Sequence, residues 1–200
     1  MLKGLRKSSF SQIQLNAGVF LRDVDWRSAA DASELKQLIA AAMEDPHHAL
    51  GLTRSGGSFT CKPTVRYMEA DGLRSDTVGA TLCDRWEVRL SGTMLEMTPE
   101  NMALCLACAE TEETAAGTRL TSRGELTEAS CIPSLLWVGS MAGGGLLLIE
   151  LKNALNTGGV SLDFRDRGEG TLPFSFLAHA DADDDALPFE IFFMKKGDGE

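Results

Sequence analysis

The stretch Leu135–Leu151, LLWVGSMAGGGLLLIEL, contains two apolar runs separated by the three consecutive glycines 143–145. Each run has the length of a β-strand and is too short to cross a membrane as a helix. Glycines between two such runs are typical of the loop of a β-hairpin. The stretch therefore predicts two neighbouring strands, largely buried, around which the rest of the fold must be built.

Further strands are predicted on both sides of this hairpin, because apolar and polar residues alternate there as they do in half-buried strands. These segments are Ile13–Val19, Phe59–Tyr67, Trp86–Met97, Val160–Phe164, Phe174–Ala178 and Phe189–Phe193. The expected fold class is mainly β, an antiparallel β-sandwich or barrel with one or two short α-helices.

Two segments predict the helices. Asp31 can cap the first, which ends before Pro46, and Thr98 can cap the second, with Pro99 at its first helical position. Apolar residues repeat at helical spacing at Leu35, Leu38, Ile39 and Ala42 in the first helix and at Met102, Cys105, Leu106 and Ala109 in the second.

The chain is predicted to form a single domain. Residues 1–12 form a basic, flexible N-terminal arm, residues 13–194 form the β domain with a helical or loop insertion at about 26–50, and residues 195–200 form a C-terminal tail. Polar residues interrupt the segment after the basic start, so we expect no signal peptide and an unprocessed cytosolic product.

Composition restricts the possible functions. The chain has 200 residues and a formal net charge of −10, and it contains no basic stripe that would grip nucleic acid by its phosphates. No apolar run is long enough for a membrane-spanning helix. The cysteine count is odd, which favours reduced thiols over a disulfide framework.

The sequence contains no complete motif for a catalytic, metal-binding or phosphate-binding site. His47 and His48 are adjacent, which favours a solvated loop over a metal-ligand pair, and Cys105 and Cys108 have CxxC spacing but lie on the apolar face of the predicted helix. The acidic loop 181–185 does not fit an EF-hand. No glycine-rich segment has the spacing of a phosphate loop or of a nucleophile elbow. We expect no catalytic site, no metal and no cofactor.

Several short motifs occur in an order that is more specific than any one of them. They are LNAGV at 15–19, GGSF at 56–59 with Pro63, WEVRLSGT at 86–93, the helix start at Thr98–Asn101, WVG at 137–139, NALNTGG at 153–159, GEGT at 168–171, His179 and LPFEI at 187–191. Over roughly residues 13 to 193 this series resembles the tail tube proteins of tailed bacteriophages, which share their fold with the tube proteins of secretion systems. The helix expected within 26–50 is longer than in a compact member of that family.

The resemblance implies a structural protein and not an enzyme. In such proteins a β-sandwich or barrel with a flanking helix closes into a hexameric ring, and the rings stack head to tail into a hollow tube that conducts DNA without binding it specifically. The implied partners are the tape measure protein, the tail terminator and the baseplate or tip, with no membrane. The implied location is the virion tail, after synthesis in the host bacterial cytoplasm. The net acidity suits a conduit that repels phosphates, or serves solubility alone.

Opposite charges at the two ends of the sequence suggest ring-stacking contacts. The candidate residues are Lys3, Arg6 and Lys7 in the arm and Asp181, Asp183, Asp184 and Asp185 in the acidic loop. The region Trp26–Leu50 and the Gly143 loop are further candidates for assembly contacts. Two other functions stay open: the tube subunit of a phage-related injection machine, such as a tailocin or a secretion system, and a small-molecule-binding β-barrel.

Overall fold

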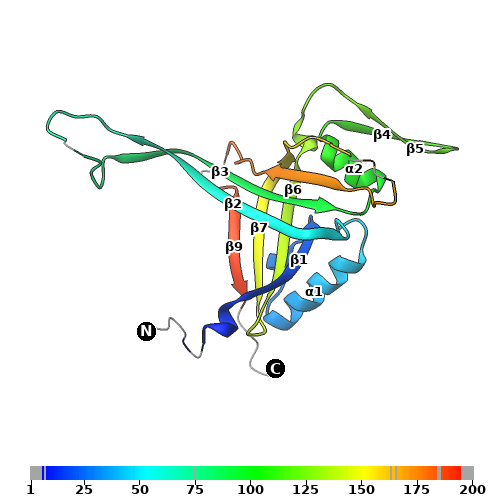
Figure 1. Ribbon diagram of the computed structural model, residues 1–200, viewed down its shortest axis with the longest axis horizontal. Coiled ribbons are helices and arrows are strands. Elements are labelled where there is room, and N and C mark those ends of the chain that lie inside the picture. The colour runs from blue at the N-terminus through cyan, green and yellow to red at the C-terminus, as the bar shows by residue number, and fades with distance from the viewer. Residues whose placement is uncertain are drawn as a thin grey trace.

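The fold is mainly β, as the sequence predicts, with 46% of the chain in strands and 16% in helices. It was analysed in a computed structural model that describes residue 6 and residues 8–73, 75–162, 164, 166–183 and 186–194. Figure 1 shows the strands gathered into one body, with one helix lying along its side and two hairpins projecting from it. Within the described residues, no helix is long and apolar enough to span a membrane.

The main sheet is antiparallel and has seven strands in the order β1-β6-β7-β8-β3-β2, with β9 paired to β7. Their bounds are β1 Gln14–Arg22, β2 Thr53–Tyr67, β3 Thr81–Met94, β6 Ile132–Met141, β7 Leu146–Asn156, β8 Leu172–Leu177 and β9 Phe189–Met194. Strand β7 pairs with β6 and β9 along most of its length and with β8 only at Leu155 and Asn156. Strand β7 therefore connects the group formed by β1, β6 and β9 with the group formed by β8, β3 and β2.

The predicted central hairpin is confirmed as β6 and β7. The two strands pair from Ile132–Ala154 to Ser140–Leu146, and the glycines form the turn between them. Both faces of the hairpin are buried, in two separate apolar cores. The first core includes Leu135, Ile149 and Leu151, and the second includes Leu136, Val138 and Leu148. Burial on both faces explains why this stretch is continuously apolar and does not alternate.

Helix α1, Ala32–Glu44, confirms the first predicted helix. The carboxylate of Asp31 accepts hydrogen bonds from the backbone N–H groups of Ser33 and Glu34 at 2.8 and 2.9 Å. Leu35 and Ile39 are buried in the second core, against the face of the sheet opposite the first core. The predicted insertion at 26–50 therefore forms a layer that covers one face of the sheet.

Helix α2, Pro99–Leu106, confirms the second, with Thr98 as its cap. Its predicted length is wrong at the C-terminal end. The helix stops because Ala107 takes a positive φ of 62°, and Ala109 begins a strand instead of extending the buried face. Strands β4, Ala109–Thr114, and β5, Gly117–Ser122, form a separate two-stranded hairpin that the sequence analysis missed.

The predicted strand at Val160–Phe164 is also wrong, because the described residues of that segment form no strand. The Asn156 side chain instead holds a turn just before this segment. Its Oδ1 accepts from the N–H groups of Ser175 and Gly158, and its Nδ2 donates to the carbonyl of Gly159. Val160 and Leu162 still pack against the first core, whereas Phe164 is 87% exposed.

Candidate assembly surfaces

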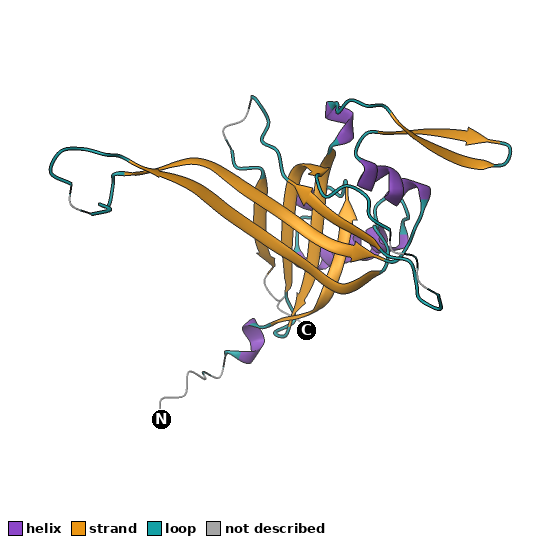
Figure 2. Cartoon of the chain, turned by 45° about the horizontal axis from the view of Figure 1, so that its top comes forward, coloured by secondary structure: helices purple, strands orange, loops and turns teal. Residues whose placement is uncertain are grey.

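The hairpin formed by β2 and β3 extends beyond the body of the protein (Figures 1 and 2). Its two strands stay paired as far as Tyr67 and Thr81. Pairing between β3 and β8 ends much earlier, at Arg89 and Leu177. Within the described part of the chain, the outer half of the hairpin is therefore a ribbon of only two strands.

Large apolar side chains are exposed along this ribbon. Trp86 is 40% exposed, Val65 41% and Tyr67 50%. The loop at its tip exposes Met68, Leu73 and Val78 as well. An isolated two-stranded ribbon is only marginally stable in water, and clustered exposed apolar groups are typical of interaction surfaces. These features favour a ribbon that is covered when the protein is assembled.

The two edges of the ribbon differ in their capacity to pair with another strand. The Val88 carbonyl accepts from the Ala178 N–H at 2.9 Å, so the backbone groups of Val88 face the β8 side. The N–H and C=O groups of successive residues point to alternate edges of a strand, so those of Trp86 point to the same side as those of Val88. The backbone groups of Pro63, which pairs with Trp86, point to the outer edge of β2. Proline has no N–H, and it therefore weakens that outer edge. The β3 edge at Trp86 keeps both its donor and its acceptor.

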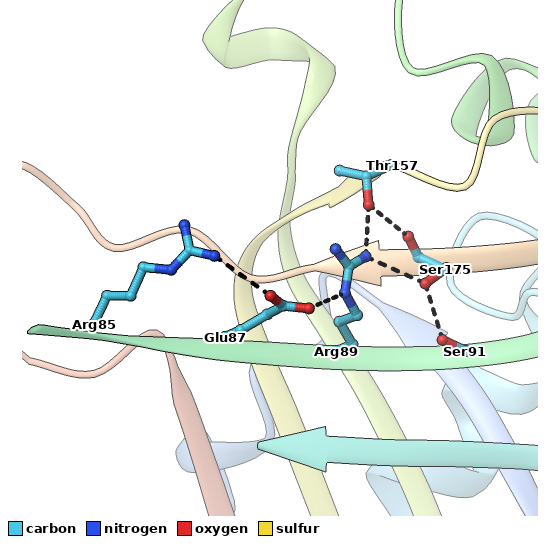
Figure 3. A network of polar contacts seen from close by, with 6 residues as sticks. All are labelled: Arg85, Glu87, Arg89, Ser91, Thr157 and Ser175. Atoms are coloured by element: carbon cyan, nitrogen blue, oxygen red, sulfur yellow. Dashed lines mark hydrogen bonds and ion pairs between the residues drawn. The ribbon is translucent and has the colours of Figure 1, made fainter. Parts of the chain in front are cut away.

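One face of β3 and β8 carries a connected set of polar side chains (Figure 3). Arg89 donates to Glu87 and to Thr157, each at 2.7 Å, and Ser91 donates to Ser175 at 3.0 Å. The hydrogen bond and charge of Arg89 lower the pKa of the Glu87 carboxyl. The charge of Arg89 on this face is therefore neutralised by the neighbouring carboxylate of Glu87.

A cleft of about 660 Å³ lies between the unpaired part of β3 and the segment that joins β8 to β9. Trp86 and Glu87 contribute to one wall, and His179, Asp181 and Leu187 contribute to the other. The ring Nδ1 of His179 lies 3.2 Å from the Asn153 carbonyl, which anchors the start of the second wall to β7. The cleft has about twice the volume of other clefts among the described residues, such as those of about 310 Å³ beside Tyr67 and about 340 Å³ beside Val24.

The described chain next to the two predicted stacking segments lies at opposite ends of the sheet. The chain after the arm is fixed at the β6–β7 turn, where the Gly143 N–H donates to the Ser11 carbonyl at 3.0 Å. The acidic loop enters β9 at the other end of β7, where Phe189 pairs with Leu151. Arg6, Asp181 and Asp183 are exposed, whereas Lys3, Lys7, Asp184 and Asp185 lie outside the described residues. Among the described residues of one chain, Arg6 forms no ion pair with Asp181 or Asp183.

The region Trp26–Leu50 is fixed to the sheet by a polar cluster as well as by α1. The Arg27 guanidinium forms ion pairs with Glu150 of β7 and Glu190 of β9, and Ser134 donates to Glu150. Burial alone would raise the pKa of the Glu150 carboxyl, but the hydrogen bonds from Arg27 and Ser134 outweigh burial and lower it. Glu150 is therefore a buried carboxylate stabilised by its cation, in a structural role.

The other candidate sites remain separate in space. His47 is exposed, while the His48 ring nitrogen lies 2.9 Å from the Arg22 carbonyl. Cys105 is fully buried, and burial raises the pKa of its thiol to about 12, whereas Cys108 lies beyond the helix near Ser122. In the part of the chain that the structure describes, no group of three or more His, Cys, Asp or Glu side chains is placed to hold a metal ion.

No protein-family model matches this chain, and no curated protein matches it. The features of this chain that bear on function are therefore the hairpin, its edges and the cleft. The sequence predicts the charged segments but not the cleft, because the walls of the cleft come from residues far apart in the chain. The one local signal that could have pointed to an edge of this hairpin is Pro63 in β2.

Proposed function

We propose that this protein is the tube subunit of a phage tail, which closes into hexameric rings that stack into a hollow tube for the passage of DNA. The observation that carries the proposal is the β2–β3 hairpin, which projects from the body with exposed apolar side chains and a free strand edge. Such a ribbon gains stability only when a second surface covers it. In a protein that assembles with itself, a neighbouring copy supplies that surface.

The position of the hairpin favours a ring or a filament over a simple dimer. It projects from one side of the body and can therefore reach a surface of a neighbouring copy other than that copy's hairpin. Contacts between two different surfaces generate rings when the rotation closes and filaments when it does not. A second contact of this kind, between the basic start of one copy and the acidic loop of the next, is supported by Ser11 and Phe189, which lie next to these segments and at opposite ends of the sheet.

The charges of the protein agree with a conduit that does not hold DNA. The net charge is −10, and many arginines already form ion pairs with carboxylates of the same chain. These arginines are Arg27, Arg54, Arg66, Arg85, Arg89, Arg119 and Arg123. A cation already paired with a carboxylate releases little free energy on meeting a phosphate, so passing DNA experiences weak attraction.

Sedimentation velocity of paired variants tests the proposal. Trp86→Lys places a charge on the apolar side of the ribbon, whereas Phe164→Lys makes the same change at an exposed residue outside it. We expect the wild type and Phe164→Lys to form large particles as concentration rises and Trp86→Lys to stay small. Equal assembly of both variants would remove the hairpin from the interface, and a monomeric wild type at every concentration and salt would contradict self-assembly.

A further inference from the structure

The β3 edge that lines the cleft is unpaired at Trp86. Its N–H and C=O point into the cleft, by the alternation described above, and have no hydrogen-bond partner among the described residues. A free strand edge of this kind binds an extended segment through backbone hydrogen bonds, while the flanking side chains select its charge. The cleft therefore has the geometry to accept a short added strand.

The two walls of the cleft differ in charge. On the β3 wall, Glu87 pairs with Arg89 at 2.7 Å and with Arg85 at 3.5 Å, and Asp84 pairs with Arg66 at 3.3 Å. On the opposite wall, Asp181 lines the cleft, and Asp183 follows just outside it; both are exposed, and neither forms an ion pair with a described residue. The segment 180–188 contains four aspartates and no basic residue. The uncompensated charge of the cleft is therefore negative and belongs to this wall.

The N-terminal arm has the complementary chemistry. Residues 1–8, MLKGLRKS, contain Lys3, Arg6 and Lys7 and no acidic residue. Leu2, just before Lys3, and Leu5, between Lys3 and Arg6, can contact apolar groups such as Trp86 in the β3 wall. No other stretch of this length in the chain combines three basic residues with an absence of acids.

The arm of the same chain is poorly placed to fill this cleft. The arm leaves the body at the Leu146 end of β7, and the cleft lies near Lys152, whose carbonyl accepts from the His179 N–H. This part of β7 measures about 20 Å at ~3.3 Å per residue. Eight extended residues reach at most about 28 Å, so an arm that ran along its own sheet would have almost no length left to lie in the cleft. A copy stacked beyond the acidic end presents its arm there directly.

We infer that the cleft between β3 and residues 180–182 and 186–188 is the docking site for the basic arm, residues 1–8, of a second copy of this chain. The arm adds to the β3 edge as a short extended strand and places its basic side chains near Asp181 and Asp183. This inference rests on the proposed function, because head-to-tail stacking brings the arm of one copy to the cleft of the next.

Disulfide trapping tests the contact, because the native Cys83 is exposed and lines the cleft. A Leu5→Cys chain is prepared in isotopically light and heavy forms, mixed, mildly oxidised and digested. We expect the linked peptide to join position 5 to Cys83 and to include pairs of one light and one heavy chain. Leu126→Cys, a matched control at an exposed position outside the arm, should give little of this link.

Charge exchange makes the test specific. Reversing the arm with Lys3→Glu, Arg6→Glu and Lys7→Glu should lower the yield of the link about tenfold, and so should Asp181→Lys with Asp183→Lys. Combining both sets should restore the yield, because the charges again attract. The inference is overturned if the combined variant is not restored, if single reversals leave the link unchanged, or if linked chains are only light with light and heavy with heavy.

The trapping experiment separates the two proposals. Tubes that form without any light–heavy link between the arm and Cys83 would keep the proposed function and reject the arm contact. A charge-dependent light–heavy link in a protein that never forms tubes would keep the arm contact and reject the tube.

Discussion

Arg27 joins three elements of the fold through one side chain. Its guanidinium pairs with Glu150 in β7 and Glu190 in β9 and lies 4.5 Å over the ring of Trp26. Arg27→Met would leave the buried Glu150 without its cation. We expect a loss of about 2 kcal/mol in the free energy of unfolding, less than for a fully buried pair because Arg27 is partly exposed. Urea denaturation measures it, and Arg167→Met, an exposed arginine, is the control.

The same ion pair makes stability depend on pH. The pKa of Glu150 is lower in the folded protein than its ordinary value of 4.5. A lowered pKa stabilises the fold above the ordinary value, and this stability is lost as the pH falls through the folded pKa. Between pH 5 and strongly acidic pH, about pH 2, we expect wild-type stability to fall more steeply than that of Arg27→Met. If the unfolding free energies of the two proteins change with pH in parallel, Arg27 does not set this pKa.

Gly92 is required by packing between strands. A Cβ at this position would lie 2.6 Å from the ring of Phe174, which itself packs edge-on against Phe20 at 5.1 Å. We predict that Gly92→Ala lowers stability by about 1–3 kcal/mol, because the ring must shift within a filled core. In thermal denaturation, the double variant Gly92→Ala, Phe174→Leu should lose less stability than the sum of the losses of the two single variants. Strict additivity would mean that the contact with Phe174 is not the cause.

At the scale of elements, the helices and the central hairpin were predictable because their signals are local. Asp31 and Thr98 cap their helices as the sequence indicates, and the three glycines turn the chain between β6 and β7. The errors lie where single residues redirect the chain. The side chain of Asn156 holds a turn at Gly158 and Gly159 before the segment predicted as a strand, and a positive φ at Ala107 ends α2 early. Neither is visible in the pattern of apolar residues.

Helix α1 supplies a prediction at this scale. Asp31 satisfies two backbone N–H groups at the start of the helix, and removing such a cap costs about 1 kcal/mol. We expect Asp31→Ala to lower the free energy of unfolding by this amount and Asp31→Asn to change it little. Because α1 covers the second core, hydrogen exchange should rise along the whole helix in Asp31→Ala and stay unchanged in β8.

At the scale of the whole molecule, the charged ends could be read from the sequence, but their relation in space could not. The sequence shows a basic arm and an acidic loop, and only the strand pairing shows that Ser11 and Phe189, next to these segments, lie at opposite ends of one sheet. The cleft beside Trp86 depends on where the pairing of β3 with β8 stops, which no sequence pattern marks. The same is true of the length by which the β2–β3 hairpin extends beyond the body.

The central claim is that this protein assembles with itself into a hollow tube. Negative-stain electron microscopy of the purified chain, over a series of protein and salt concentrations, tests it most directly. We predict rings with a central opening in end view and stacked, hollow tubes in side view, both absent in Trp86→Lys. Compact single particles under every condition, for the wild type as for the variant, would contradict the claim.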